Sequence, residues 1–107
     1  MITNHGATLW ILGIKTEGLG TVIETTGKGQ TELLGGLLYP CWGDPGATPA
    51  FTITDSTATL TYATLDFNFP EVKNYTVQVR QTQGTQTKSL ELGGNRVLVP
   101  LFVGSKL

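Results

Sequence analysis

The side chains able to do acid–base or metal chemistry are few in this chain, and their spacing matches no catalytic pattern. His5 is the only histidine. The sequence shows no nucleophile or orienting partner for it, although a catalytic base needs one. Asp44, Asp55 and Asp66 recur at intervals of 11 residues, but they lack the dense oxygen-ligand spacing of a calcium loop. We interpret these three as solvated turn residues, and we expect no catalytic residue, metal site or cofactor.

Two aromatic residues are the best candidates for binding a ligand. Tyr39 and Trp42 flank a turn at the start of the turn-rich segment 41–49. Aromatic rings can be exposed there and can stack on sugar rings. Packing in a core or an interface is the alternative, because aromatic side chains supply large contact areas. Asn74 opens an Asn-Tyr-Thr triplet, which fits the acceptor pattern for N-glycosylation. Such triplets also arise by chance in a chain this rich in threonine.

Composition narrows the class of protein. Charged residues make up 14% of the chain, against about 25% in average soluble proteins, and threonine, glycine and glutamine fill the gap. Threonine favours pleated strands, and the 14 glycines and 5 prolines mark frequent turns. A net charge of −1 without a basic stripe argues against nucleic-acid binding. The sequence has no run of about 18 apolar residues, so no membrane span is expected. It also shows no recognisable signal peptide.

The first 40 residues contain an internal match at an offset of 23 residues. The matched pairs are Thr8 with Thr31, Trp10 with Leu33, Ile11 with Leu34, Gly13 with Gly36, and Ile14 with Leu37. A fixed period of about 20 to 50 residues is typical of repeat architectures, in which each unit buries its apolar face against its neighbours. The segment therefore indicates two rungs of a solenoid. An antiparallel hairpin is the alternative that the same glycine turns allow.

The second half of the chain favours antiparallel strands. In residues 58–69 the apolar positions change from even to odd numbers, which predicts a bulge or turn near Ala63. Residues 75–82 form the clearest strand, and residues 87–92 can return as its antiparallel partner. Residues 96–103 form a last strand. The two faces of the clearest strand are expected to carry Tyr75, Val77 and Val79 on one side and Thr76, Gln78 and Arg80 on the other.

Three phrases resemble the end of a known family of proteins. Two phrases are similar to the final coils of bacterial proteins of the pectate-lyase-like superfamily: NHGATLWILGIKTEG (4–18) and GTVIETTGKGQTELLGGLLYP (20–40). A third phrase is similar to the segment that follows those coils: NYTVQVRQTQGTQTK (74–88). The resemblance implies the end-piece of a right-handed parallel β-helix and a relationship to polysaccharide-acting or surface proteins. Enzymes of this family use clustered aspartates, or a calcium site with a basic residue, on middle coils. We find no matching cluster, so no functional residue is carried over.

These observations together predict a single all-β domain. A short segment similar to a right-handed parallel β-helix is expected over about residues 1–55, followed by antiparallel hairpins that cap it over about residues 56–107. A compact β-sandwich of seven or eight strands is the alternative architecture, because it also uses many short strands with frequent turns.

The expected function is that of a non-catalytic, self-assembling structural protein, because two rungs cannot close a core of their own. An exposed coil end presents unpaired strand edges, and complementary ends would propagate head to tail as a filament. The residues expected at this interface are Trp10, Ile11, Leu12, Ile14, Tyr75, Val77 and Val79. The alternative is a carbohydrate-binding or accessory module of a polysaccharide-degrading protein, and an enzyme would be a fragment of a polysaccharide lyase or hydrolase. We expect a homo-oligomer or a polysaccharide partner, outside the cell or on its surface.

Overall fold

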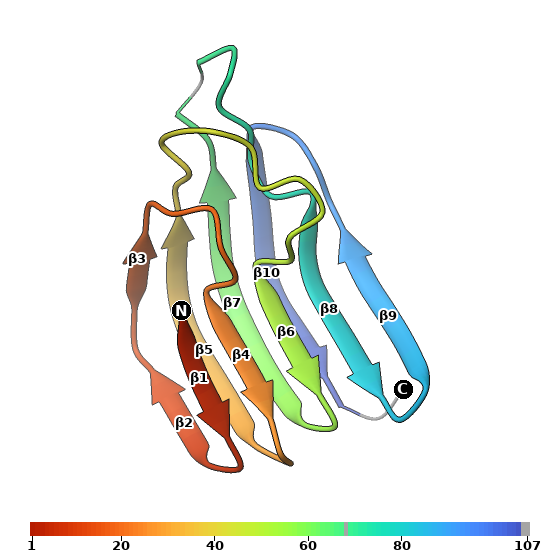
Figure 1. The fold of residues 1–107 in the computed structure, drawn as a ribbon. Helices are drawn as coiled ribbons and strands as arrows, with labels where there is room; N and C mark the ends of the chain where they lie inside the picture. Colours follow the sequence, from red (N-terminus) through yellow and green to blue (C-terminus); the bar gives the residue numbers. More distant parts are fainter. Residues whose placement is uncertain (68, 106–107) are drawn as a thin grey trace.

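Threonine-rich and apolar runs between glycine and proline turns fold into β-strands, and the described residues contain no helix. The computed structural model describes residues 1–67 and 69–105, drawn in Figure 1. Its strands are β1 (Ile2–His5), β2 (Thr8–Ile11), β3 (Ile14–Thr16), β4 (Ile23–Thr26), β5 (Gln30–Leu38), β6 (Phe51–Thr54), β7 (Thr57–Leu65), β8 (Val77–Gln83), β9 (Gln86–Glu91) and β10 (Arg96–Gly104). The prediction of an all-β chain is confirmed.

The strands form two sheets that face each other, and buried apolar side chains from both sheets fill the space between them. One sheet has the order β1-β4-β6-β8-β9. The other has the order β10-β7-β5-β2, with β3 also paired to β5. Each sheet contains parallel and antiparallel pairs. This two-layered arrangement is compatible with the compact β-sandwich that the sequence left as the alternative.

The chain alternates between the two sheets from β1 to β8 (Figure 1). In the first sheet β1, β4, β6 and β8 pair in parallel, and in the second sheet β2, β5 and β7 do so. β9 joins β8, and β10 joins β7, in antiparallel pairs. The predicted hairpin of residues 75–82 with 87–92 is therefore present as β8 and β9. Parallel pairing continues beyond residue 56, where antiparallel hairpins were expected to begin.

The register of β2 and β3 on β5 differs from the internal sequence match by one residue. β2 and β3 lie opposite β5 at an offset of 22, so that Ile11 faces Leu33 and Trp10 faces Glu32. The predicted offset of 23 is wrong. A shift of one residue moves every side chain to the opposite face of a strand, and the observed register places Leu33 in the core while Leu34 is exposed. Two adjacent leucines made the two registers look alike in the sequence.

In-register pairing stacks apolar side chains into columns across each sheet. The column in the first sheet consists of Ile2, Ile23, Phe51 and Val79. The column in the second sheet consists of Ile11, Leu33, Leu60 and Phe102. Full burial of such a side chain contributes about 1.5–3 kcal/mol. The buried members of the columns therefore stabilise the packing of successive strands in addition to the backbone hydrogen bonds.

β7 alternates buried and less buried positions without interruption, so the bulge predicted near Ala63 is wrong. The irregularities lie in the two strands beside it, within residues 34–37 of β5 and within residues 99–102 of β10. In β5, Gly35 has a φ of 98°, and a Cβ on Gly36 would come 3.2 Å from a side-chain carbon of β7. Position 35 favours glycine because other residues rarely adopt this φ, and a side chain at position 36 would require its neighbours to shift.

One polar side chain links the two sheets inside the core. Gln78 is fully buried, whereas the sequence predicted it on the outer face, because the pairing of β8 with β9 is irregular within residues 77–79. Its Oε1 accepts a hydrogen bond from the Tyr62 hydroxyl (3.0 Å). Its Nε2 donates to the backbone oxygens of Tyr75 (2.9 Å) and Leu92 (2.9 Å). A buried amide is stable in such a position because it is hydrogen-bonded.

We expect the buried tyrosines to make the fold sensitive to alkaline pH. Burial raises the pKa of Tyr62 and raises the pKa of Tyr75 to about 12, whereas the pKa of an unfolded tyrosine is about 10. Above about pH 10 the unfolded chain therefore releases protons that the folded chain keeps. The free energy of unfolding should then fall by up to about 1.4 kcal/mol per pH unit for each tyrosine.

Urea unfolding between neutral and strongly alkaline pH measures this slope. The Tyr75→Phe chain should show a shallower slope than the native chain, because one group no longer ionises on unfolding. Its stability at neutral pH should also fall, since the hydroxyl lies 2.6 Å from the Gly20 backbone oxygen. An unchanged alkaline slope in this variant would contradict the assignment.

Candidate functional site

Residues 2–16 end both sheets with unpaired strand edges. β1 is the edge strand of one sheet, and β2 with β3 forms the edge of the other. These strands lie on the same side of the molecule (Figure 1), and we call the surface that they form the open end. An unpaired edge presents backbone N–H and C=O groups that can pair with another strand.

Inward-facing side chains at the open end are less buried than their register partners deeper in the fold. Ile2 is 36% exposed, whereas its partner Ile23 is 1% exposed. Ile11 is half-buried, whereas its partner Leu33 is fully buried. Ile14 is also half-buried. The apolar layer formed by residues 2–16 is therefore covered on one side by β4 and β5 and faces solvent on the other.

An apolar hollow of about 410 Å³ adjoins the open end. Its apolar walls are formed by Met1, Ile2, Ile14 and Val22. Tyr75, which comes much later in the sequence, also lines this hollow. Within residues 2–16, Trp10 is 69% exposed and Leu12 is 77% exposed. The structure therefore brings together four of the residues predicted at an assembly interface. These four are Trp10, Ile11, Leu12 and Ile14.

The other three predicted interface residues do not lie on a surface. Tyr75, Val77 and Val79 are buried in the core. Their strand β8 is flanked by β6 and β9, so its backbone has no free edge. The prediction that these side chains form an interface is therefore wrong. The sequence pattern identified an apolar face correctly, but that face packs inside this chain.

The opposite edges of the two sheets carry features that oppose further pairing. β9 presents the exposed charged residues Lys88 and Glu91. β10 contains Pro100, which has no backbone N–H, and its pairing is irregular within residues 99–102. Charges, prolines and bulges on edge strands are the usual devices that prevent edge-to-edge association. The open end lacks comparable features in β1 and β2, whose sequences are ITNH and TLWI.

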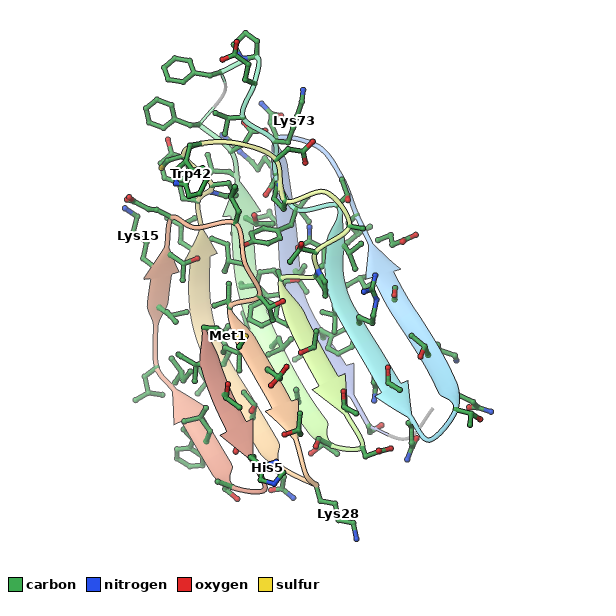
Figure 2. The ribbon with its side chains drawn as sticks, in the orientation of Figure 1. Met1, His5, Lys15, Lys28, Trp42 and Lys73 are labelled. Atoms are coloured by element: carbon green, nitrogen blue, oxygen red, sulfur yellow. The ribbon has the colours of Figure 1, made fainter. Side chains whose placement is uncertain are left out.

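Aromatic rings gather in the loops that follow β5 and β7. The Tyr39 ring centroid lies 5.9 Å from that of Phe67, which lies 4.7 Å from that of Phe69. Phe67 and Phe69 are exposed, and Trp42 is 63% exposed. Figure 2 shows Trp42 among these loops. Both phenylalanines belong to residues 58–69, whose apolar positions the sequence placed in a strand, and their exposure was missed although Pro70 marks a loop at this point.

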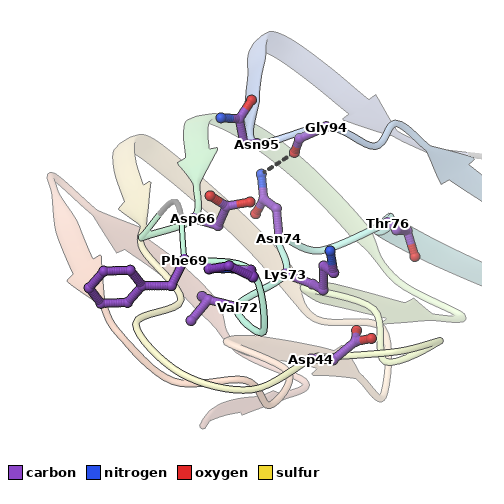
Figure 3. Close-up of a pocket in the computed structure, with 10 residues that line it drawn as sticks. Asp44, Asp66, Phe69, Val72, Lys73, Asn74, Thr76, Gly94 and Asn95 are labelled. Atoms are coloured by element: carbon purple, nitrogen blue, oxygen red, sulfur yellow. Dashed lines mark hydrogen bonds between the residues drawn. The ribbon is translucent and has the colours of Figure 1, made fainter.

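The same loops border a hollow of about 620 Å³ (Figure 3). Its lining includes Asp44, Asp66, Phe69 and Lys73. The Asp44 carboxylate accepts a hydrogen bond from the Gly46 N–H (2.8 Å), as expected of a turn residue. Asp66 is buried, so its prediction as a solvated turn residue is wrong. The hollow combines carboxylates, an ammonium group and an aromatic ring, a mixture that can bind polar ligands.

Asn74 is a buried connector between loops and is not available for glycosylation in the folded chain. Its side chain is 5% exposed. Nδ2 donates to the backbone oxygens of Thr64 (3.2 Å) and Gly94 (3.0 Å), and Oδ1 accepts from the Tyr75 N–H (2.8 Å) and the Thr64 hydroxyl. Figure 3 shows the bond to Gly94. The predicted acceptor site is therefore corrected to a structural role.

His5 is the last residue of β1 and Asp55 directly follows β6, so both lie at the other end of the strands. His5 Nδ1 lies 2.9 Å from Thr26 Oγ1, and the side chain is labelled in Figure 2. The Asp55 carboxylate accepts a hydrogen bond from the Gly84 N–H (2.8 Å). Within residues 1–67 and 69–105, no three His, Cys, Asp or Glu side chains are grouped to hold a metal ion. The same residues form no helix long and apolar enough to cross a membrane.

Comparison with known proteins identifies no relative: the chain matches no protein-family model, and no curated protein or solved structure is similar to it. The resemblance to the pectate-lyase-like superfamily stays a prediction from the three sequence phrases. The geometry of the open end and of the loops is therefore the basis for a functional proposal.

We expect the Asn74→Ala chain to lose about 2–3 kcal/mol of unfolding free energy, because it leaves buried hydrogen-bonding groups without partners. Thr76→Ala is the matched control. It destroys the same acceptor triplet, but Thr76 is exposed and makes one long hydrogen bond to the Gly46 backbone oxygen (3.2 Å). Urea unfolding of both variants separates a structural role of the Asn74 side chain from the mere loss of the Asn-Tyr-Thr triplet. Equal losses in the two variants would contradict the structural role of Asn74.

Proposed function

We propose that this chain is a non-catalytic structural protein: a short right-handed parallel β-helix that assembles through its open end. The alternation of the chain between two sheets and the parallel pairing of successive strands support a helical winding. Its right-handed sense follows from the general preference of parallel crossover connections. β9 and β10 then serve as the antiparallel cap of the winding, later in the chain than the sequence indicated.

The incomplete apolar layer of the first rung is the observation that carries this proposal. The register partners of Ile2 and Ile11 are buried because another rung covers them, and the open end lacks such cover. In repeat architectures, terminal units with a polar outer face are needed to keep the array soluble. An apolar rung with free strand edges is instead suited to receive a further layer. A scaffold or surface structure outside the cell is the setting in which we place such an assembly.

We expect the purified chain to associate, and we expect the association to depend on the open end. Sedimentation velocity over a wide concentration range and negative-stain electron microscopy measure it. The double variant Trp10→Lys with Leu12→Lys should shift the chain to monomers, because it places charges beside the apolar rung. The matched control is Leu98→Lys with Leu101→Lys on β10, where both leucines are similarly exposed. A native chain that stays monomeric at high concentration would sink the proposal.

Carbohydrate binding is a second candidate function, favoured by the rings in the loops after β5 and β7. Trp42 is exposed, and Tyr39 belongs to the contacting set of rings beside the polar hollow. Exposed aromatic faces and neighbouring polar groups are able to bind a polysaccharide. The module would then be an accessory part of a polysaccharide-degrading system.

Retention of the chain on insoluble polysaccharides tests this second candidate. Trp42→Ala should abolish retention while the circular dichroism spectrum stays native. Trp10→Ala is the matched control, because it removes an equally exposed indole from a different surface. Loss of retention in both variants, or no retention of the native chain on any glycan, would count against a site at Trp42.

A further inference from the structure

We propose that the partner at the open end is the same surface of a second copy, so that the assembly is a closed two-fold dimer and not a filament. This inference rests on the proposed function, because it names the partner of the open end. A filament needs the open end of one copy to meet the opposite end of the next. A two-fold contact needs only the open end, which then meets itself.

The opposite edges are unsuited to receive the open end. Lys88 and Glu91 place charges on β9, and Pro100 removes a hydrogen-bond donor from β10. The irregular pairing within residues 99–102 further distorts that edge. Head-to-tail addition would press the apolar first rung against these strands. Charged side chains on an edge strand disfavour the addition of an apolar strand beside them.

The charge pattern of the open end fits contact with itself. In a two-fold contact, side chains near the axis meet copies of themselves, and like charges placed opposite each other are destabilising. β1 and β2 contain no Asp, Glu, Lys or Arg. In β3, Lys15 Nζ donates to the Glu17 carboxylate (2.6 Å), and this hydrogen bond raises the pKa of Lys15. The edge therefore presents apolar side chains, uncharged polar side chains such as Thr3 and Thr8, the imidazole of His5, and one hydrogen-bonded pair of charges.

The backbone of β1 has donors and acceptors free for a two-fold pair. Ile2 N–H donates to the Val22 oxygen (2.8 Å), and Gly6 N–H donates to the Thr26 oxygen (2.9 Å). In a parallel pair, alternate residues bond to the same neighbour, so the peptide groups of Thr3 point away from β4. A two-fold axis through this point pairs β1 with its copy in the antiparallel sense. The two copies of the first sheet then become one continuous sheet.

Disulfide trapping tests this arrangement, carried out in a Cys41→Ser chain because Cys41 is the native free thiol. Thr3→Cys should form a disulfide-linked dimer at a low protein concentration, because residues near the axis meet their own copies. Lys88→Cys on β9 is the control and should stay unlinked under the same conditions. Efficient linkage at position 88 with none at position 3 would overturn the two-fold contact.

Thr3→Pro supplies an independent measurement. It removes an outward-pointing N–H from the free edge, so the fold should be kept while the dimer weakens roughly tenfold or more. Thr3→Lys is the second variant if the proline chain does not fold, and circular dichroism monitors both. Sedimentation of the native chain should reach a dimer and stop there. Concentration-dependent growth beyond the dimer would overturn this inference and leave the proposed function standing, whereas a monomer at all concentrations would overturn both.

Discussion

In-register parallel pairing is the constraint on which the rest of this structure depends. Each inward side chain must fit the one above and the one below it, as Ile23 does between Ile2 and Phe51. A parallel pair requires a crossover connection, and here the chain passes through the other sheet before it returns to form the next parallel strand. The array can be closed by antiparallel strands, as β9 and β10 close it on one side. On the other side, the apolar layer that contains Ile2 and Ile11 has no covering strand. This difference leaves apolar side chains exposed at the open end.

Local signals made part of this structure predictable. The all-β class followed from threonine-rich runs with frequent turns, and the β8–β9 hairpin followed from an alternating strand and a glycine turn. The register of β2 on β5 could not be predicted, because Leu33 and Leu34 are equivalent as residue types and differ only in what lies beside them. The bulge near Ala63 was predicted from the change from even to odd apolar positions within residues 58–69, whereas β7 keeps its alternation up to its end at Leu65 and the irregular pairing lies at residues 34–37 of β5. A bulge in one strand disturbs the pairing of its neighbour, so its position is a property of the sheet.

The candidate site was predictable to a similar extent. Trp10 and Leu12 were expected at an assembly interface; the structure exposes both side chains, and their part in an interface stays a prediction. Tyr75 was misplaced, because alternation in a strand identifies an apolar face without identifying what covers it. Asn74 was misread because an acceptor triplet is a local pattern, whereas its hydrogen bonds reach residues 64 and 94. Contacts of this range are set by the fold as a whole.

Buried polar side chains distinguish the observed register from its neighbours. The Asn4 amide lies within hydrogen-bonding distance of the backbone oxygens of Ala7 and Gln30 and of the Thr31 hydroxyl (3.0–3.1 Å). The Thr31 hydroxyl in turn lies 2.7 Å from that of Thr25. A slip of one residue would turn Thr31 to the outer face and leave the other groups buried without it, at a cost of about 1–3 kcal/mol for each group. Leu33 and Leu34 alone would tolerate such a slip of β5, so the buried threonines and the asparagine add to the apolar pattern in selecting the register that leaves Ile2 and its neighbours at the open end.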